Sequence, residues 1–558
     1  MPFGLPSGQG IQVAKEVASA ADVSVTVAAS ASTPVDPAAR HASSLPRELG
    51  KPEDDLQLDV RAYQVDGLPG VSAADLAEVT APFTGTARHY EDLGNAVAAV
   101  TRYMQRKLGY YVGMAYLPEQ KLQDGVVHIF ALEGRLDDVQ VRWPAALPVR
   151  HEVIERYLAL LKPGAILRVA DIERVVYLVN DLPGVRARFE IEPGREPGTA
   201  SLIVTPEAEP RFSGRLEYDT LGPRNTSVSR FGVRAVIASP TGLGDALQLN
   251  LRGSAGGGLY DGSLSYSLPV GGSGLKLGAM LSEVHYFLPS AAVQQNLRGT
   301  ATLGDVFGLY PVVRSRNLNL FMLATVARKR FEDRWESLVV RRSTQSVQLG
   351  VLGDDRDDGF GGAVSTYELS LLQGRAALGP LYSLTGLRAT YRKLNVSWSR
   401  LQSLVPGRLQ LYLRAKGQFA NTNLDPSERM PIGGADGVRA FDPAEGAADD
   451  AQLLTAELRW LPPASLFGNV ARELVFSAFY DWGHARYAHA PDALGALAAE
   501  LLGPQNRATL GAVGAGVLWE RRNDFSMRFN LAWHVQGQPT IRPHSHLPRA
   551  EMVLSKAF

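Results

Sequence analysis

The sequence predicts a transmembrane β-barrel preceded by two small α+β modules, and three observations lead to this fold class. After about residue 209, apolar and polar residues alternate over many short stretches, and helical patterns almost vanish. Before residue 209, the same order of expected strands and helices occurs twice. Only 20% of the residues are charged and 55 of 558 are glycine, whereas soluble proteins average about 25% charged residues. No apolar run approaches the roughly 18 residues of a membrane-spanning helix, so strands are the expected spanning elements.

The charge balance and the absence of cysteine exclude several function classes. Lys and Arg total 57, as do Asp and Glu, so the formal net charge is zero. This balance argues against a nucleic-acid binder, which would need a basic excess to release counterions. The absence of cysteine removes disulfide scaffolds, thiolate metal sites and cysteine nucleophiles together.

Residues 1–55 form an N-terminal segment rich in Ala, Ser and Pro, with one short apolar stripe between Ile11 and Ala21. Two interpretations stay open, a linker and a docked helix. The segment lacks the basic and apolar regions of a secretory signal.

Residues 56–134 and 135–208 each predict a β-α-α-β-β module. In the first, Leu56–Val65 alternates as a strand does. A helical stripe with steps of three and four follows, at Leu93, Val97, Val100, Met104 and Leu108. Further strands are expected at 111–116, 126–132, 139–143, 185–192 and 200–205, and further helices at 151–161 and 169–180.

Residues 209–558 predict the barrel. Its clearest strand is Phe525–Val535, in which large apolar residues alternate with Ser, Arg, Asn, Ala and His. A soluble sandwich also alternates, but charges on the polar face and aromatics at the ends of the apolar face favour lipid outside and a hydrated lumen inside. Counting back from the C-terminus gives about 16 strands, an even number. Connections alternate between tight, as at 521–524, and long, as at 421–451 and 484–506.

The motifs of enzymes and cofactor sites are absent from the sequence. There is no phosphate-binding loop, no G-x-S-x-G elbow and no H-E-x-x-H zinc motif. Asp354–Asp358 lacks the ligand spacing and closing Glu of an EF-hand. We therefore expect no catalytic residue, no cofactor and no metal site.

Two motifs near the C-terminus stand out. Gly433 and Gly434 precede Val438-Arg439-Ala440-Phe441, and Phe479-Tyr-Asp481-Trp-Gly483 lies two expected strands later. With them, the chain resembles the outer-membrane transporters of two-partner secretion, the TpsB family of ShlB/FhaC/HecB haemolysin secretion and activation proteins, within the BamA superfamily. Further matching segments are 116–125, 178–185, 193–198, 240–245 and 310–316.

The resemblance implies a location, a partner and a mechanism. The modules would be POTRA domains in the periplasm, and the barrel would span the outer membrane of a Gram-negative bacterium, in contact with its lipid. The partner would be an unfolded TpsA-type exoprotein of the haemolysin or adhesin class, captured by the modules and moved through the barrel, with no nucleic acid involved. A BamA-like assembly factor is the alternative. The N-terminal segment would include a plug helix, as in some relatives.

The resemblance also assigns roles to the two motifs. Val438, Arg439, Ala440 and Phe441 would lie in the sixth extracellular loop, and Phe479, Asp481 and Gly483 on strand thirteen. An inward-folded loop would bring Arg439 to Asp481 as a lumenal salt bridge, where a bidentate contact fixes direction as well as distance. Gly433 and Gly434 would permit the turns of the loop tip. Ala440 stands where the family usually has Gly, so the sequence does not determine whether the tip keeps the family's backbone geometry.

Overall fold

The computed structural model describes residues 46–50, 57–289, 296–335, 338–377, 387–443, 445–494, 505–537 and 547–558. The expected plug helix and most of the N-terminal linker lie outside the described residues. The described residues up to Glu209 form one compact unit, and those from Pro210 form another.

The first module contains β1 (Leu58–Val60), β2 (Ala62–Asp66), α2 (Ala73–Thr80), β3 (Gly85–Arg88), α3 (Tyr90–Arg106), β4 (Met114–Tyr116) and β5 (Val126–Leu132). β5 pairs in parallel with β2 and antiparallel with β4. The stripe of α3 is buried at Leu93, Ala96, Val100 and Met104, and it forms the core of the module. The stretch expected as one strand is two, because Arg61 and Ala62 both donate to the Gly125 carbonyl and β1 pairs with β3.

The second module contains β6 (Arg135–Val141), α4 (His151–Leu158), α5 (Val169–Asn180), β7 (Val185–Pro193) and β8 (Thr199–Ala208). β8 is the central strand, parallel to β6 and antiparallel to β7. One face of α5, including Ile172, Val176 and Val179, is buried. The expected helices and strands of this module are present, with ends shifted by a few residues.

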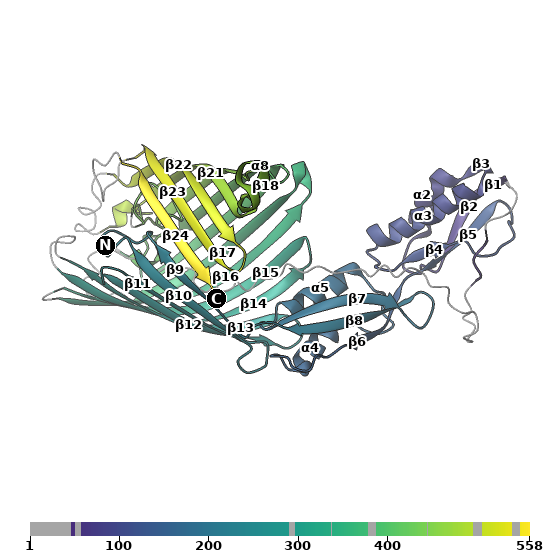
Figure 1. The fold of residues 1–558 in the computed structure, drawn as a ribbon, viewed down its shortest axis with the longest axis horizontal. Helices are drawn as coiled ribbons and strands as arrows, with labels where there is room; N and C mark the ends of the chain where they lie inside the picture. The colour runs from purple at the N-terminus through teal and green to yellow at the C-terminus, as the bar shows by residue number, and fades with distance from the viewer. Residues whose placement is uncertain are drawn as a thin grey trace. The chain divides into compact units, whose positions relative to one another are not determined.

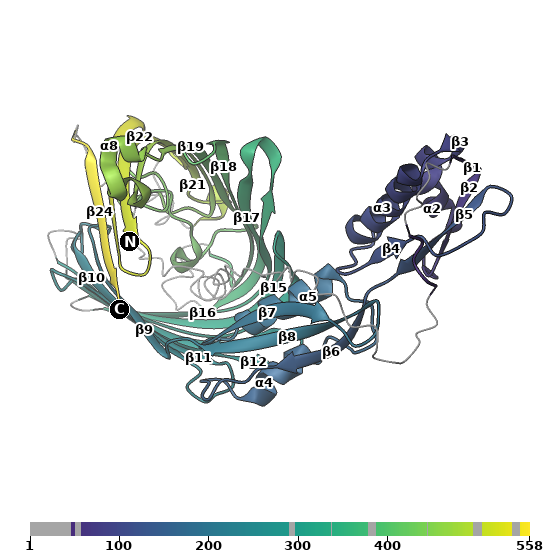
Figure 2. The ribbon, with the colours of Figure 1, turned by 45° about the vertical axis from the view of Figure 1, so that its right-hand side comes forward.

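The remaining strands close into one antiparallel barrel, so the expected transmembrane barrel of about 16 strands is confirmed. The order runs from β9 to β24, and β24 pairs with β9. In Figures 1 and 2 it is the part coloured from teal to yellow. Its strands are β9 (Phe212–Asp219), β10 (Arg230–Ala238), β11 (Ala246–Ser254), β12 (Leu259–Val270), β13 (Leu275–Leu288), β14 (Leu297–Arg314), β15 (Leu318–Arg334), β16 (Val339–Asp357), β17 (Ala363–Ala377), β18 (Thr390–Val405), β19 (Leu409–Ala420), β20 (Asp450–Trp460), β21 (Leu474–Arg486), β22 (Arg507–Arg521), β23 (Phe525–Gln536) and β24 (Arg549–Ala557).

The two faces of the barrel wall differ as a membrane protein requires. Along β13, Leu277 and Leu281 are exposed on the outer face, whereas Met280 between them is buried on the lumenal face. Exposed aromatic side chains, among them Tyr260 and Trp460, stand at the ends of strands. The pattern fits an apolar outer band with aromatic girdles. No helix in the described part of the chain is both long and apolar enough to cross a membrane.

Not all connections follow the expected asymmetry. On the side expected to carry long loops, residues 255–258 alone join β11 to β12. The link between β20 and β21 carries the short helices α8 (Ala464–Phe467) and η4 (Gly468–Glu473) instead of a tight turn. Phe467 packs against Phe476 of β21 with ring centroids 5.6 Å apart, so this link rests on the barrel wall.

Candidate functional site: loop six inside the barrel

Loop six, residues 421–449 between β19 and β20, folds into the barrel (Figure 2). Ile432, Val438 and Phe441 are fully buried and pack with residues of β20 to β23. Counted from β9, loop six is the sixth connection on its side, and β21 is strand thirteen. The two sequence motifs therefore lie on the loop and the strand that the resemblance implies.

The tip of loop six is a tight turn built on glycine. Val438 N–H donates to the Ile432 carbonyl at 2.8 Å, and Gly434, with φ +88°, has a left-handed backbone. A Cβ on Gly433 would lie 2.3 Å from the Asp442 carbonyl oxygen, closer than any atom tolerates. Position 433 therefore requires glycine because the Asp442 backbone approaches it closely, and position 434 requires glycine because its φ is positive.

Arg439 and Asp481 meet in the lumen. Nε donates to Asp481 Oδ2 at 2.7 Å, and Nη2 donates to Oδ1 at 2.9 Å. The Arg439 backbone N–H adds a third bond to Oδ2 at 3.2 Å, and the Thr455 hydroxyl donates to Oδ1 at 3.0 Å. Since Asp481 is only 1% exposed, this bidentate pair is largely removed from water.

The guanidinium of Arg439 has two further partners. Nη1 donates to Glu457 Oε2 on β20 at 2.9 Å, and Cζ lies 3.2 Å from the ring centroid of Phe479. Burial disfavours the charged form of Arg439, but Asp481 and Glu457 outweigh it and raise its pKa above the usual range. Arg439 is therefore held charged between two carboxylates and one aromatic face.

Each residue of the strand-thirteen motif has its own contact with the loop. Phe479 lies under the guanidinium, and Asp481 accepts its hydrogen bonds. Gly483 leaves room for Val438, because a Cβ at Gly483 would lie 3.0 Å from the Val438 Cγ2. These contacts are the physical reason for an aromatic, an acid and a glycine at alternate positions of one strand.

Ala440 does not disturb the tip. It is buried and has no positive φ, so its backbone does not need glycine. Phe441 next to it packs edge-on against the His534 ring of β23, with centroids 4.6 Å apart. Arg549 of β24 donates to the Phe441 carbonyl at 2.6 Å. The departure from the family pattern at Ala440 is therefore compatible with a closed, well-packed tip.

A second charged anchor, which the sequence analysis missed, holds the start of loop six. Glu428, fully buried, binds Lys329 Nζ of β15 at 2.8 Å and Lys393 Nζ of β18 at 3.0 Å. Asp425 pairs with Arg342 of β16. Burial would raise the pKa of Glu428, but the two ammonium groups outweigh it and lower the pKa to about 2. Loop six therefore reaches from the wall at β20–β21 to the wall at β15–β18.

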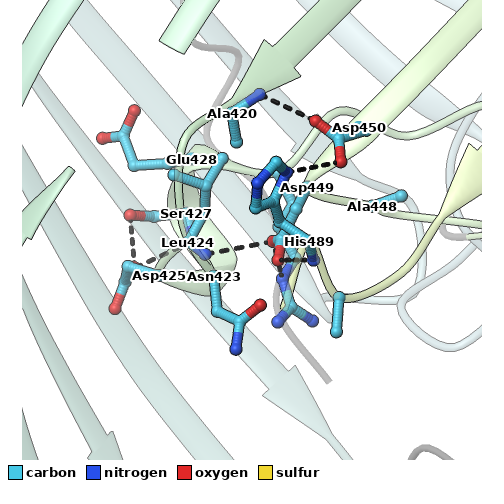
Figure 3. Close-up of polar contacts among 12 residues, drawn as sticks. Ala420, Asn423, Leu424, Asp425, Ser427, Glu428, Ala448, Asp449, Asp450 and His489 are labelled. Carbon is cyan, nitrogen blue, oxygen red and sulfur yellow. Dashed lines mark hydrogen bonds and ion pairs between the residues drawn. The ribbon is translucent and has the colours of Figure 1, made fainter. Parts of the chain in front are cut away.

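A third contact joins loop six to the connection after β21 (Figure 3). The carboxylate of Asp449 accepts from Leu424 N–H at 3.1 Å, from Arg429 Nε at 3.0 Å and from His489 N–H at 3.0 Å. Asn423 and Ala490 exchange two hydrogen bonds of 2.8 Å. Asp449 thus ties the two ends of loop six together and to the neighbouring connection.

The residues of this site hold loop six to the inner wall of the barrel. Its groups are paired ions, amides and packed aromatics, and the described residues hold no His, Asp and Glu cluster suited to a metal ion. A small hollow of about 340 Å³ borders the pair and is lined by Arg414, Arg439, Glu457, Arg528 and others. The lumen beside the loop tip is therefore strongly polar.

These features define a POTRA-bearing barrel of the bacterial outer membrane. The chain belongs to the haemolysin secretion/activation protein ShlB/FhaC/HecB family, whose profile matches residues 198–503. The ShlB-type POTRA domain matches residues 58–134. The expected family and the outer-membrane location, with the POTRA modules in the periplasm, are thereby confirmed.

Individual relatives are similar over most of their length. The heme/hemopexin transporter protein HuxB of Haemophilus influenzae is 23% identical over 465 residues, 82% of this chain and 80% of the relative. The outer membrane transporter CdiB of Dickeya dadantii is 24% identical over 485 residues, 84% of this chain and 81% of the relative. The structure of CdiB from Escherichia coli shares the fold, with a TM-score of 0.70 at 19% identity, covering 92% of this chain and 93% of that one.

Proposed function

We propose that this protein exports an unfolded exoprotein of the TpsA type, which its POTRA modules recognise and its barrel conducts to the cell surface. The observation that carries the proposal is the combination of the inward-anchored loop six with two modules ahead of a closed barrel. Family membership supports it. The class we propose for this exoprotein is haemolysin or adhesin, and the name of one relative, the hemolysin transporter protein HpmB of Proteus mirabilis, supports the haemolysin class.

The second module offers a strand edge for an extended polypeptide. One edge of β7 pairs with β8. At the other edge, the Asn180 carboxamide clamps Ala187, because its oxygen accepts from the Ala187 N–H and its nitrogen donates to the Ala187 carbonyl. Beyond that clamp, residues 189–193 form an edge. An unfolded chain can add to such an edge through main-chain hydrogen bonds, which demand little of its sequence.

Loop six is the element that must shift for a chain to pass. It spans the lumen between two charged anchors, at Arg439–Asp481 and at Glu428. The Arg439–Asp481 anchor combines a bidentate pair with aromatic stacking, and it sets the position of the tip. We therefore assign Arg439 and Asp481 a positioning role in transport, with Gly433, Gly434 and Gly483 providing the space.

An assembly factor that inserts other barrels is the second candidate. BamA from Haemophilus ducreyi, lacking POTRA domains 1–3, shares the barrel fold with a TM-score of 0.52 at 11% identity, covering 90% of this chain and all of that one. Such a likeness concerns the fold alone. The match to the secretion family over more than half of the chain favours export.

A photoreactive amino acid at the lumenal position Arg528 tests the proposal. Arg528 borders the polar hollow, whereas the side chain of Met527, its neighbour on β23, has the opposite direction toward lipid. In cells that secrete the exoprotein, position 528 should crosslink a polypeptide also found in the medium, and position 527 should not. Equal crosslinking at both positions, or capture of barrel proteins at 528, would contradict export.

A further inference from the structure

The outer face of the barrel carries a cluster of arginines whose side chains face away from the lumen. This outer basic patch lies on β15 to β18 and consists of Arg328, Arg330, Arg334, Arg341, Arg375 and Arg392, all exposed. Charged side chains on a lipid-facing wall are costly at the middle of the membrane, by about 2–4 kcal/mol each. Six arginines on four adjacent strands are therefore expected near the edge of the membrane, with anions close enough to neutralise them.

Strand register places these side chains on the outer face. Lys329, between Arg328 and Arg330, points into the lumen and binds Glu428. Side chains alternate along a strand, so both arginines point outward, as does Val326, which is 60% exposed. Arg328 is paired with Gln345, and Gln345 with Arg375, which puts Arg375 on the same face two strands away, about 10 Å from Arg328.

The length of the apolar stretch places the patch at the outer edge of the membrane. On β15 the outward residues from Leu318 to Val326 are Leu, Leu, Met, Ala and Val. Eight residue steps of about 3.3 Å, tilted by about 40°, rise roughly 20 Å. That is most of the apolar band of about 25 Å. Because β15 begins on the periplasmic side, Arg328 lies where the outer leaflet's hydrocarbon gives way to headgroups.

The patch has more cations than its own carboxylates neutralise. Glu332 Oε1 and Oε2 bind Arg334 and Arg341. Glu283, on the outer face of β13, pairs with His285. Within the described part of the chain, Arg328, Arg330 and Arg375 have no carboxylate partner. Three guanidinium groups are therefore available to an external anion.

Two hollows adjoin these three arginines. The larger, about 1300 Å³, is lined mainly by outward apolar side chains such as Leu281, Val306 and Leu371, and it reaches Arg328 and Arg375. The smaller, about 670 Å³, includes Arg330 and Arg341 with Thr300 and Thr302. An apolar hollow that ends in cations matches a molecule with acyl chains below an anionic headgroup.

We propose that the outer basic patch binds a phosphorylated glycolipid of the outer leaflet, of the lipopolysaccharide kind. Its acyl chains occupy the larger hollow, and its headgroup phosphates accept hydrogen bonds from Arg328, Arg330 and Arg375. Arginine suits this role because its planar donors bind phosphate oxygens in pairs. Binding of this lipid does not depend on polypeptide transport, so it is tested separately.

The test compares lipid binding by purified full-length protein in detergent micelles. The probe is purified lipid A with both phosphates, and its dephosphorylated form is the second arm. The test variant is R328Q/R330Q/R375Q. The matched control is R356Q/R408Q/R522Q, which changes three exposed arginines at the periplasmic ends of strands.

For the wild-type protein and the control variant we expect tight binding of the phosphorylated lipid and at least ten-fold weaker binding of the dephosphorylated one. The test variant should lose at least ten-fold in affinity for the phosphorylated lipid only. Equal affinity of the wild-type protein for both lipids would overturn the proposal and needs no variant. Equal loss in the control variant would overturn it as well, since it would show a general charge effect. Heat-dependent gel mobility verifies that each barrel is folded.

Discussion

Replacing Arg439 with alanine should release the tip of loop six. The change removes two hydrogen bonds to Asp481, one to Glu457 and the stacking on Phe479. Removing one partner of a buried ion pair costs about 3–5 kcal/mol, because the remaining charges stay buried. The lower end applies here, since the Arg439 side chain is 10% exposed and Thr455 still donates to Asp481. A loss of about 3 kcal/mol shifts the open population on the order of a hundred-fold.

The absence of cysteine provides the assay. Val438 is fully buried at the tip, and a Val438→Cys substitution introduces a unique thiol of similar size. A maleimide that cannot cross membranes will label this thiol only when the tip opens, so the labelling rate follows the open population. In the Val438→Cys background, Arg439→Ala should raise the rate on the order of a hundred-fold.

A matched control is Arg459→Ala. Arg459 also binds Glu457, at 2.9 Å, but does not contact Asp481. The Arg459 side chain is 30% exposed and Glu457 keeps its bond to Arg439, so the loss should be less than about 1 kcal/mol and labelling should rise by no more than a few-fold. If Arg439→Ala and Arg459→Ala give the same rate, the Arg439–Asp481 pair does not hold the tip.

Three further changes test other parts of the structure. Glu428→Gln leaves the ammonium groups of Lys329 and Lys393 without their buried counter-charge and should destabilise the start of loop six by about 3–5 kcal/mol. The expected result is faster amide hydrogen exchange of residues 421–430 with exchange in β21 unchanged. Unchanged exchange of residues 421–430 would contradict it. Met104→Ala empties a fully buried position of α3 and should cost the first module about 2–5 kcal/mol, seen as cleavage within residues 57–134 at a lower urea concentration while the barrel stays intact. Leu281→Arg, at a lipid-facing position in the middle of β13, should destabilise the folded barrel in lipid vesicles by about 2–4 kcal/mol, whereas a loss below about 0.5 kcal/mol would place Leu281 outside the apolar band.

The barrel was predictable because its signal is local and repeated. Each strand alternates between lipid and lumen, so the Phe525–Val535 pattern alone indicates the two faces. The β-α-α-β-β order of the first module includes α2, although its bounds were not predicted, whereas the four-residue strand β3 escaped because it is too short to show an alternating pattern. The break at Arg61 escaped because its cause, the Gly125 carbonyl, is remote in sequence.

The candidate site was only half visible in the sequence. Arg439 and Asp481 lie in motifs, and their contact follows from the family resemblance. Glu428 has no motif, and its partners Lys329 and Lys393 lie 99 and 35 residues away on different strands. In the sequence these lysines are ordinary members of a polar strand face. Only the closed barrel shows that they converge on one carboxylate.

The most direct test of export is comparison of secreted proteins with and without this protein. Deletion should remove one large polypeptide from the culture medium, and the wild-type gene should restore it. Arg439→Ala, present in the outer membrane at wild-type amount, should fail to restore it fully. An unchanged set of secreted proteins, together with lower amounts of other outer-membrane barrels, would contradict export and identify an assembly factor.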